Sequence, residues 1–169
     1  LENYYDVAKA AEFDQLFGHL AIGGNPTPLH NQYLVMRWDF SFVTPKPTYE
    51  AQQQALTDYL NEEMKDFIRK YASLFTHAID IDPTNATASF RSLISVVQRA
   101  GHKLYLLVDE YDNFANEVMM GAGGQNRQRY NDLVTGEGMF KTFFKNVKSA
   151  GSGEGLDRVF MTGVSPIVM

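Results

Sequence analysis

The chain has 169 residues, with 15 Lys and Arg against 20 Asp and Glu, and its formal net charge of −5 argues against a dedicated nucleic-acid or anionic-membrane surface. Hydrophobic residues make up 44% and charged residues 21%, proportions that suit one globular domain and disfavour a disordered, collagen-like or coiled-coil protein. The absence of cysteine excludes disulfides, thiolate metal sites and cysteine nucleophiles, and it fits a reducing, cytoplasmic compartment.

The first half of the chain predicts short helices, a strand and a long helix. Apolar residues recur at rough helical spacing over residues 2–17, before Gly and Pro residues break the pattern. Residues 33–40 are rich in β-forming side chains, and prolines follow them, which predicts the first strand. From residue 49 to 75, apolar residues fall at i, i+3, i+4 and i+7, which predicts a long amphipathic helix.

The second half alternates helices with strands. Residues 86–100 predict a helix that ends before Gly101, a typical C-cap residue. The continuous apolar run over 104–108 predicts a strand over 103–109 and is typical of a strand buried on both faces, as in a parallel sheet. Residues 138–147 predict another helix, and 158–162 predict a third strand. This alternation favours an α/β fold with a parallel sheet, in which ligands bind at the carboxyl ends of the strands.

Two adjacent acids follow the central apolar run. A buried strand delivers Asp109 and Glu110 to a fixed place at the sheet edge, where Asp109 can hold the water shell of Mg²⁺ and Glu110 can polarise an attacking water. The plainer alternative is that the strand simply ends in polar turn residues, with Asp112 capping a following helix. Thr162 ends the next predicted strand, so it would lie beside the acids and could contact a γ-phosphate, or else be an ordinary β-branched strand residue.

Residues 106–117 and 157–166 together resemble the prokaryotic AAA-ATPase-like family, a group of P-loop ATPases. Residues 38–41 resemble the family's second conserved strand, and residues 1–6 resemble the helix directly after its phosphate-binding loop. The resemblance covers nearly the whole chain. It implies an α/β P-loop NTPase core of the additional-strand type, and members of this family often carry a PD-(D/E)XK nuclease-like domain further along the chain.

The resemblance also implies roles for individual residues. Asp109 and Glu110 match the Walker B pair, with Asp109 positioning Mg²⁺ through water and Glu110 acting as general base in ATP hydrolysis. Thr162 matches the sensor-1 position, which contacts the γ-phosphate. Asp112 matches a recurrent Asp of the family without an assigned role. Asp39 matches an acid at the end of the adjacent strand, which is either a group near the substrate or a turn residue, with the turn slightly favoured.

The phosphate-binding loop G-x-x-x-x-G-K-[ST] is absent from the sequence. The family places that loop immediately before the position of Leu1, and the chain starts without Met and closes on an apolar stretch. We therefore expect residues 1–169 to be one partial AAA-ATPase-like domain that lacks the Walker A strand and loop. Alone, it is not expected to bind ATP tightly.

Two other functions stay open. Asp109, Glu110 and Asp112 could instead form the metal cluster of a Mg²⁺-dependent nuclease, or the fold could be a degenerate NTPase that serves as an interaction module. A client, either nucleic acid or protein, and a homo-oligomeric assembly are equally left open. No membrane partner is expected, because no apolar run approaches the ~20 residues that span a bilayer.

Overall fold

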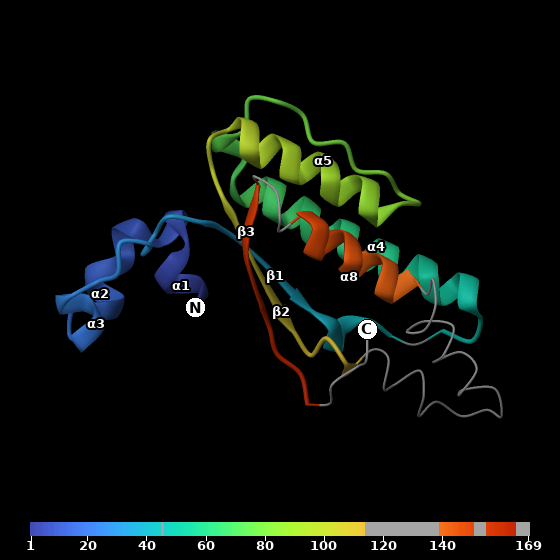
Figure 1. The fold of residues 1–169 in the computed structure, drawn as a ribbon, viewed down its shortest axis with the longest axis horizontal. Helices are drawn as coiled ribbons and strands as arrows, with labels where there is room; N and C mark the ends of the chain where they lie inside the picture. The colour runs from blue at the N-terminus through green and yellow to red at the C-terminus, as the bar shows by residue number, and fades with distance from the viewer. Residues whose placement is uncertain (45, 114–138, 151–154, 165–169) are drawn as a thin grey trace.

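The computed structural model describes residues 1–44, 46–113, 139–150 and 155–164, and a central three-stranded sheet organises them. Three helices, α4, α5 and α8, cover one face of this sheet, while short helices from the start of the chain lie on the other side (Figure 1). Among the described helices, none has the length and apolar character that crossing a bilayer requires.

The sheet is parallel throughout. Its strands β1 (Leu34–Asp39), β2 (Leu104–Asp109) and β3 (Leu156–Met161) lie in the order β1-β2-β3. The register places Asp39 beside Asp109, so the carboxyl ends of β1 and β2 meet at one edge. The predicted α/β alternation and parallel sheet are confirmed.

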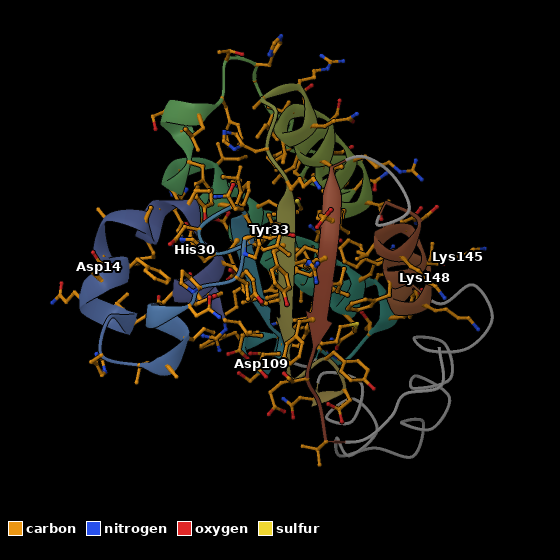
Figure 2. The ribbon with its side chains drawn as sticks, turned by 60° about the vertical axis from the view of Figure 1, so that its left-hand side comes forward. Asp14, His30, Tyr33, Asp109, Lys145 and Lys148 are labelled. Carbon is orange, nitrogen blue, oxygen red and sulfur yellow. The ribbon has the colours of Figure 1, made fainter. Side chains whose placement is uncertain are left out.

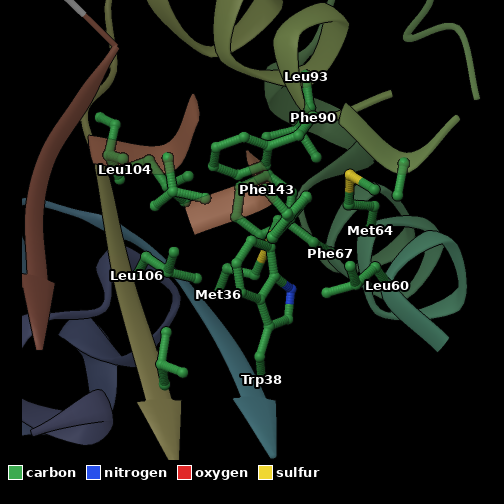
Figure 3. Close-up of a cluster of buried hydrophobic side chains, with 14 of the residues drawn as sticks. Met36, Trp38, Leu60, Met64, Phe67, Phe90, Leu93, Leu104, Leu106 and Phe143 are labelled. Atoms are coloured by element: carbon green, nitrogen blue, oxygen red, sulfur yellow. The ribbon is translucent and has the colours of Figure 1, made fainter. Parts of the chain in front are cut away.

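The helical layer consists of α4 (Tyr49–Lys70), α5 (Ala86–Arg99) and α8 (Met139–Ala150). Their apolar faces pack on alternate side chains of the strands, because successive strand residues point to opposite faces. Trp38 is fully buried at the centre, with its ring 5.3 Å from Phe90 and 5.4 Å from Phe143 between centroids (Figure 3). These residues form the main hydrophobic core.

Local signals fix where the crossover helices begin and end. The side chain of Thr48 accepts a hydrogen bond from the Ala51 N–H at the start of α4, and Asn85 accepts one from Ala88 at the start of α5. Such N-caps satisfy amide groups that have no partner within the helix. After α5, Gly101 adopts a φ of +73°, the left-handed conformation that the C-cap position favours in glycine.

The opposite face of the sheet is covered in part by the start of the chain. This segment forms α1 (Glu2–Tyr5), a 3-10 helix, α2 (Phe13–Phe17) and α3 (Ala21–Gly24). The 3-10 helix runs over Val7–Glu12. Tyr5 packs on the strands, its ring 6.0 Å from Tyr33 and 5.2 Å from Tyr105, in a second and smaller cluster.

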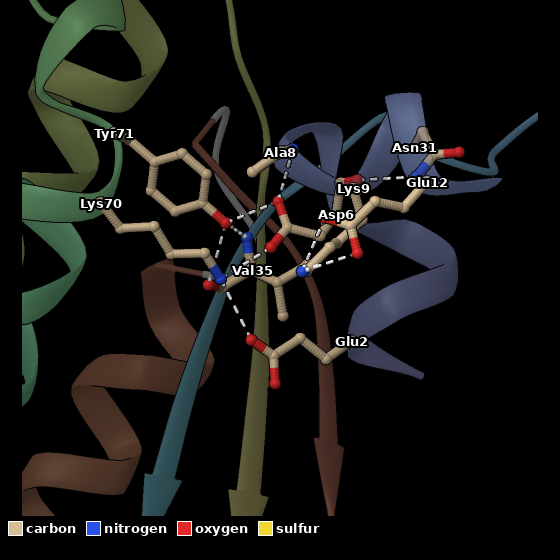
Figure 4. Close-up of polar contacts among 9 residues, drawn as sticks. All are labelled: Glu2, Asp6, Ala8, Lys9, Glu12, Asn31, Val35, Lys70 and Tyr71. Carbon is tan, nitrogen blue, oxygen red and sulfur yellow. Dashed lines mark hydrogen bonds and ion pairs between the residues drawn. The ribbon is translucent and has the colours of Figure 1, made fainter. Parts of the chain in front are cut away.

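A buried carboxylate ties this segment to the rest of the fold (Figure 4). Asp6 is fully buried, and it accepts hydrogen bonds of 2.8 Å from the Tyr71 hydroxyl and from the Ala8 N–H. Its other oxygen lies 2.7 Å from the ammonium of Lys70. Although burial alone would lower the pKa of Lys70, its hydrogen bonds with Asp6 and Glu2 raise that pKa above its ordinary value. A buried charge is tolerated only when it is paired in this way.

Two tyrosine hydroxyls, one from α4 and one from the residue directly after it, protect the outer edge of β1. The Tyr71 hydroxyl accepts a 2.9 Å hydrogen bond from the Val35 N–H, and the Tyr59 hydroxyl accepts one of 2.6 Å from the Asp39 N–H. Burial raises the pKa of both phenols, so they remain neutral. Edge strands with free amide groups invite pairing with other chains, and these contacts remove two such groups.

Some predicted boundaries are displaced in the structure. The helix expected to reach residue 75 ends at Lys70, where the backbone of Tyr71 leaves helical geometry, and a 3-10 helix follows over Ala72–Leu74. The third strand begins and ends earlier than the predicted 158–162. A further 3-10 turn, Phe40–Phe42, follows β1.

Candidate functional site

The candidate site lies where the three parallel strands end, with Asp109 at the end of β2 (Figure 2). Asp39 ends the neighbouring β1, and Thr162 directly follows β3. The Thr162 N–H donates a 2.8 Å hydrogen bond to the carbonyl of Val108, so the chain stays paired with β2 past the end of β3. The structure therefore brings together three residues that are far apart in sequence, as the predicted topology requires.

Thr162 contacts Asp109 directly. Its hydroxyl donates a hydrogen bond of 2.5 Å to Oδ1 of Asp109, and the Glu110 N–H donates one of 3.1 Å to the same oxygen. The Thr162 bond is the largest influence on this carboxyl and outweighs its partial desolvation, so the pKa of Asp109 lies below its ordinary value. Asp109 is therefore a carboxylate with one oxygen fixed in place at neutral pH.

The second oxygen of Asp109 faces an arginine. Nη2 of Arg37 lies 3.3 Å from Oδ2 of Asp109 and 3.0 Å from Oδ2 of Asp39. Oδ1 of Asp39 accepts hydrogen bonds from the N–H (3.1 Å) and the hydroxyl (2.6 Å) of Ser41. Asp39 is thus the turn residue that the sequence slightly favoured, and it also belongs to a charged cluster at the strand ends.

Glu110 adopts an unusual backbone conformation. Its φ is +52°, a left-handed value that is uncommon for residues other than glycine. The carbonyl of Glu110 accepts a 2.9 Å hydrogen bond from the Asn113 N–H, which closes a tight turn after β2. Backbone strain of this kind is concentrated at functional sites in proteins.

Asp112 fixes the segment that follows β3. Its buried carboxylate lies 3.2 and 3.1 Å from the N–H of Val164, which donates to it. The backbone of Gly163 passes so close that a Cβ there would lie 2.4 Å from Oδ1 of Asp112. The helix that Asp112 was expected to cap lies mostly outside the described residues.

The donor chemistry at the strand ends suits magnesium and a nucleotide. Carboxylate and hydroxyl oxygens are ligands that Mg²⁺ accepts, and it keeps several waters while bound to one or two carboxylates and to phosphates. In the described residues, no group of three or more His, Cys, Asp or Glu side chains is arranged to hold a metal ion. Asp109, with Oδ1 held by Thr162 and Oδ2 in contact with the exposed Arg37, fits the limited role of a group that holds the ion's water shell.

Sequence analysis missed two charged residues of this site. Arg37 precedes Asp39 by two residues in a strand, so the twofold strand period alone places both on one face. Glu63 comes from α4; desolvation and the negative charge of Asp39 raise its pKa, while Arg37 opposes the rise. No sequence signal connects Glu63 with the strand ends, because its position depends on how α4 packs.

Comparison with known proteins identifies the family. The family model described as predicted AAA-ATPase matches residues 1–169, the full length of the chain. Neither the curated proteins nor the solved structures give a significant match. The three-stranded parallel sheet is compatible with the α/β architecture that the resemblance implied. On the match over its full length, the chain belongs to the predicted AAA-ATPase family.

Proposed function

We propose that this chain supplies the Walker B and sensor-1 part of a Mg²⁺-dependent ATPase. The contact between the Thr162 hydroxyl and Asp109 is the observation that carries the proposal. It joins the ends of two adjacent parallel strands, the place where open α/β sheets bind ligands. Membership of the predicted AAA-ATPase family supports ATP as the nucleotide.

Each site residue has a role that its position supports. Asp109 holds the water shell of Mg²⁺, which neutralises the charge of the phosphates when bound. Glu110 acts as general base and takes a proton from the attacking water. Thr162 orients Asp109 through its hydroxyl and turns toward the γ-phosphate when ATP is present. Asp112 keeps the segment after Thr162 in place by holding the Val164 N–H.

The phosphate-binding loop comes, in this proposal, from residues ahead of Leu1. Within the described part of the chain, β3 pairs with β2 alone, and its side chains Val159, Phe160 and Met161 are exposed. Val159 and Met161 line an apolar groove of about 450 Å³ together with Phe144 and Val147. A strand that carries the loop would pair with this edge and cover these side chains.

The test is Mg²⁺-dependent ATP hydrolysis by the intact protein with its upstream residues. Asp109→Ala should abolish turnover, while Glu110→Gln should keep ATP binding and slow hydrolysis by about 10²-fold or more, the usual contribution of a general base. Normal turnover in the Glu110→Gln protein would contradict the assignment. Cleavage of DNA that needs Mg²⁺ but no ATP would favour the nuclease alternative, and failure to bind ATP would favour a degenerate interaction module.

The same assay can identify the partners of the ATPase. A nucleic-acid or protein client that stimulates turnover, or an oligomer that forms with ATP, would define the partners of the ATPase. We also propose a cytoplasmic location, because a chain without cysteine fits a reducing compartment.

A further inference from the structure

Two carboxylates of the site converge on one arginine nitrogen. Asp39 and Asp109 lie side by side in the register of β1 and β2, and the Oδ2 atoms of both lie within 3.3 Å of Nη2 of Arg37. Their Oδ1 atoms are occupied elsewhere, by Ser41 and by Thr162. The oxygens that remain for a cation are therefore the two that Arg37 contacts.

We propose that Arg37 is a positioning residue of this site, which offsets part of the negative charge of Asp39 and Asp109 before the metal binds and gives up Asp109 to Mg²⁺ while it stays on Asp39. The inference rests on the proposed metal role of Asp109. Arg37 is not itself a catalytic residue, because it acts only through the carboxylates that it contacts.

The geometry allows Arg37 to leave Asp109 more easily than it can leave Asp39. The side chains of Arg37 and Asp109 are 53% and 44% exposed, whereas that of Asp39 is only 19% exposed. An ion pair between exposed groups is weak and opens readily. The contact with Asp39 is also the shorter of the two, 3.0 Å against 3.3 Å. The guanidinium can therefore leave Asp109 without leaving the cluster.

A second acid keeps the released arginine close. Glu63 of α4 is near enough to both Arg37 and Asp39 that their charges act on its pKa in opposite directions. Arg37 lines one small pocket of about 180 Å³ beside β1 together with Glu63, Asp66 and Lys70. The charge of Glu63 therefore adds to that of Asp39 in holding Arg37 near β1 after it leaves Asp109.

The test measures Mn²⁺ binding by the chain itself, without ATP. Mn²⁺ is titrated into the isotope-labelled protein, and the broadening of the Asp109 and Glu110 amide signals gives the apparent affinity. Arg37→Gln should tighten binding roughly fivefold, because it removes one unit charge at contact distance from an exposed carboxylate. Arg37→Lys should behave like the wild type, because it keeps the competing charge.

Two further variants serve as controls. Arg91→Gln changes the net charge equally, but Arg91 lies on α5 and contacts Asn146 of α8, so Mn²⁺ affinity should not change. Asp109→Asn should remove the local broadening. If Arg37→Gln binds Mn²⁺ no more tightly than the wild type, the role of Arg37 is overturned and the metal role of Asp109 stands. If no variant shows broadening at Asp109, the role of Arg37 is overturned, while the role of Asp109 with bound Mg²⁺ and ATP is decided separately by the hydrolysis assay of the Asp109→Ala protein.

Discussion

The hydroxyl of Tyr71 donates a 2.8 Å hydrogen bond to the fully buried carboxylate of Asp6, 65 residues earlier in the chain. The same hydroxyl accepts from the Val35 N–H, so one oxygen joins the start of the chain, the end of α4 and β1. Tyr71→Phe removes both bonds and leaves a buried carboxylate short of a donor. We expect the free energy of unfolding to fall by about 1.5–3 kcal/mol, measured by chemical denaturation.

Tyr105→Phe is the matched control for this change. Tyr105 is buried too, and within the described residues its hydroxyl has no hydrogen-bond partner. Its loss should therefore leave stability nearly unchanged. Equal losses in the two variants would show that the bond to Asp6 contributes nothing specific.

Thr162 should control the ionisation of Asp109. The hydroxyl of Thr162 is the largest cause of the low pKa of Asp109, so Thr162→Val, which keeps the shape and removes the donor, should raise that pKa toward its ordinary value of 3.8. Thr162→Ser keeps the hydroxyl and should leave the pKa low. Carboxyl carbon shifts of Asp109, followed by NMR as a function of pH, measure the difference. An unchanged titration in Thr162→Val would show that the contact does not form in solution.

Glu63 should make stability fall as pH rises. Its pKa is raised above 4.5 by desolvation and by Asp39, so the folded state holds this proton more tightly than the unfolded state does. The associated stability is present at low pH and is lost as pH rises through the folded pKa. Glu63→Gln cannot lose a proton, so it should be more stable than the wild type at pH 7 and equal to it below pH about 4.

The neighbouring Glu62 provides a control, because its pKa is shifted in the opposite direction. A hydrogen bond from Lys65 lowers the pKa of Glu62, so its contribution is present at neutral pH and is lost on acidification. Glu62→Gln should therefore not be stabilising at pH 7. Thermal unfolding of both variants between pH 3 and pH 8 compares them, and a stabilised Glu62→Gln protein would point to a general effect of removing negative charge.

The sheet and part of the candidate site could be predicted from the sequence, because both follow from local signals combined with parallel topology. The apolar run before Asp109 and the helix stop at Gly101 are local signals, and parallel topology then places Thr162 beside Asp109 without further information. The end of α4 was wrong by five residues, because the apolar spacing continues through Leu74 while the backbone changes to a 3-10 helix. Periodic apolar spacing indicates which side chains face the core, but it does not determine whether the backbone there is an α-helix or a 3-10 helix.

Contacts between distant side chains were not predictable in this way. The bond between Asp112 and Val164 spans 52 residues, and the ion pair between Arg37 and Asp109 spans 72. Both depend on side-chain rotamers and on how closely two segments approach, which a single sequence does not encode in any local pattern. Local patterns therefore pointed to Asp109, Glu110 and Thr162, whose catalytic roles stay predictions, but they did not point to the contact between Arg37 and Asp109.

Gly163 tests whether the close packing behind Thr162 matters. A Cβ at this position would lie 2.4 Å from Oδ1 of Asp112 and 2.6 Å from the ring of Tyr111, distances that force these groups to move. Asp112 is buried and holds the Val164 N–H, so it cannot move without losing that bond. Gly163→Ala should therefore destabilise the fold by about 1–3 kcal/mol, as overpacking usually does.

The same substitution should also reach the candidate site, because Gly163 directly follows Thr162 in the chain. Moving the backbone there would lengthen the contact between Thr162 and Asp109, and the pKa of Asp109 should rise as it does in Thr162→Val. Gly24→Ala is the control, since a Cβ at Gly24 meets nothing within 4 Å. It should leave both stability and the pKa of Asp109 unchanged. A Gly163→Ala protein that loses stability but keeps the low pKa would show that the turn and the carboxylate are independent, and that Asp112 supports the fold rather than the site.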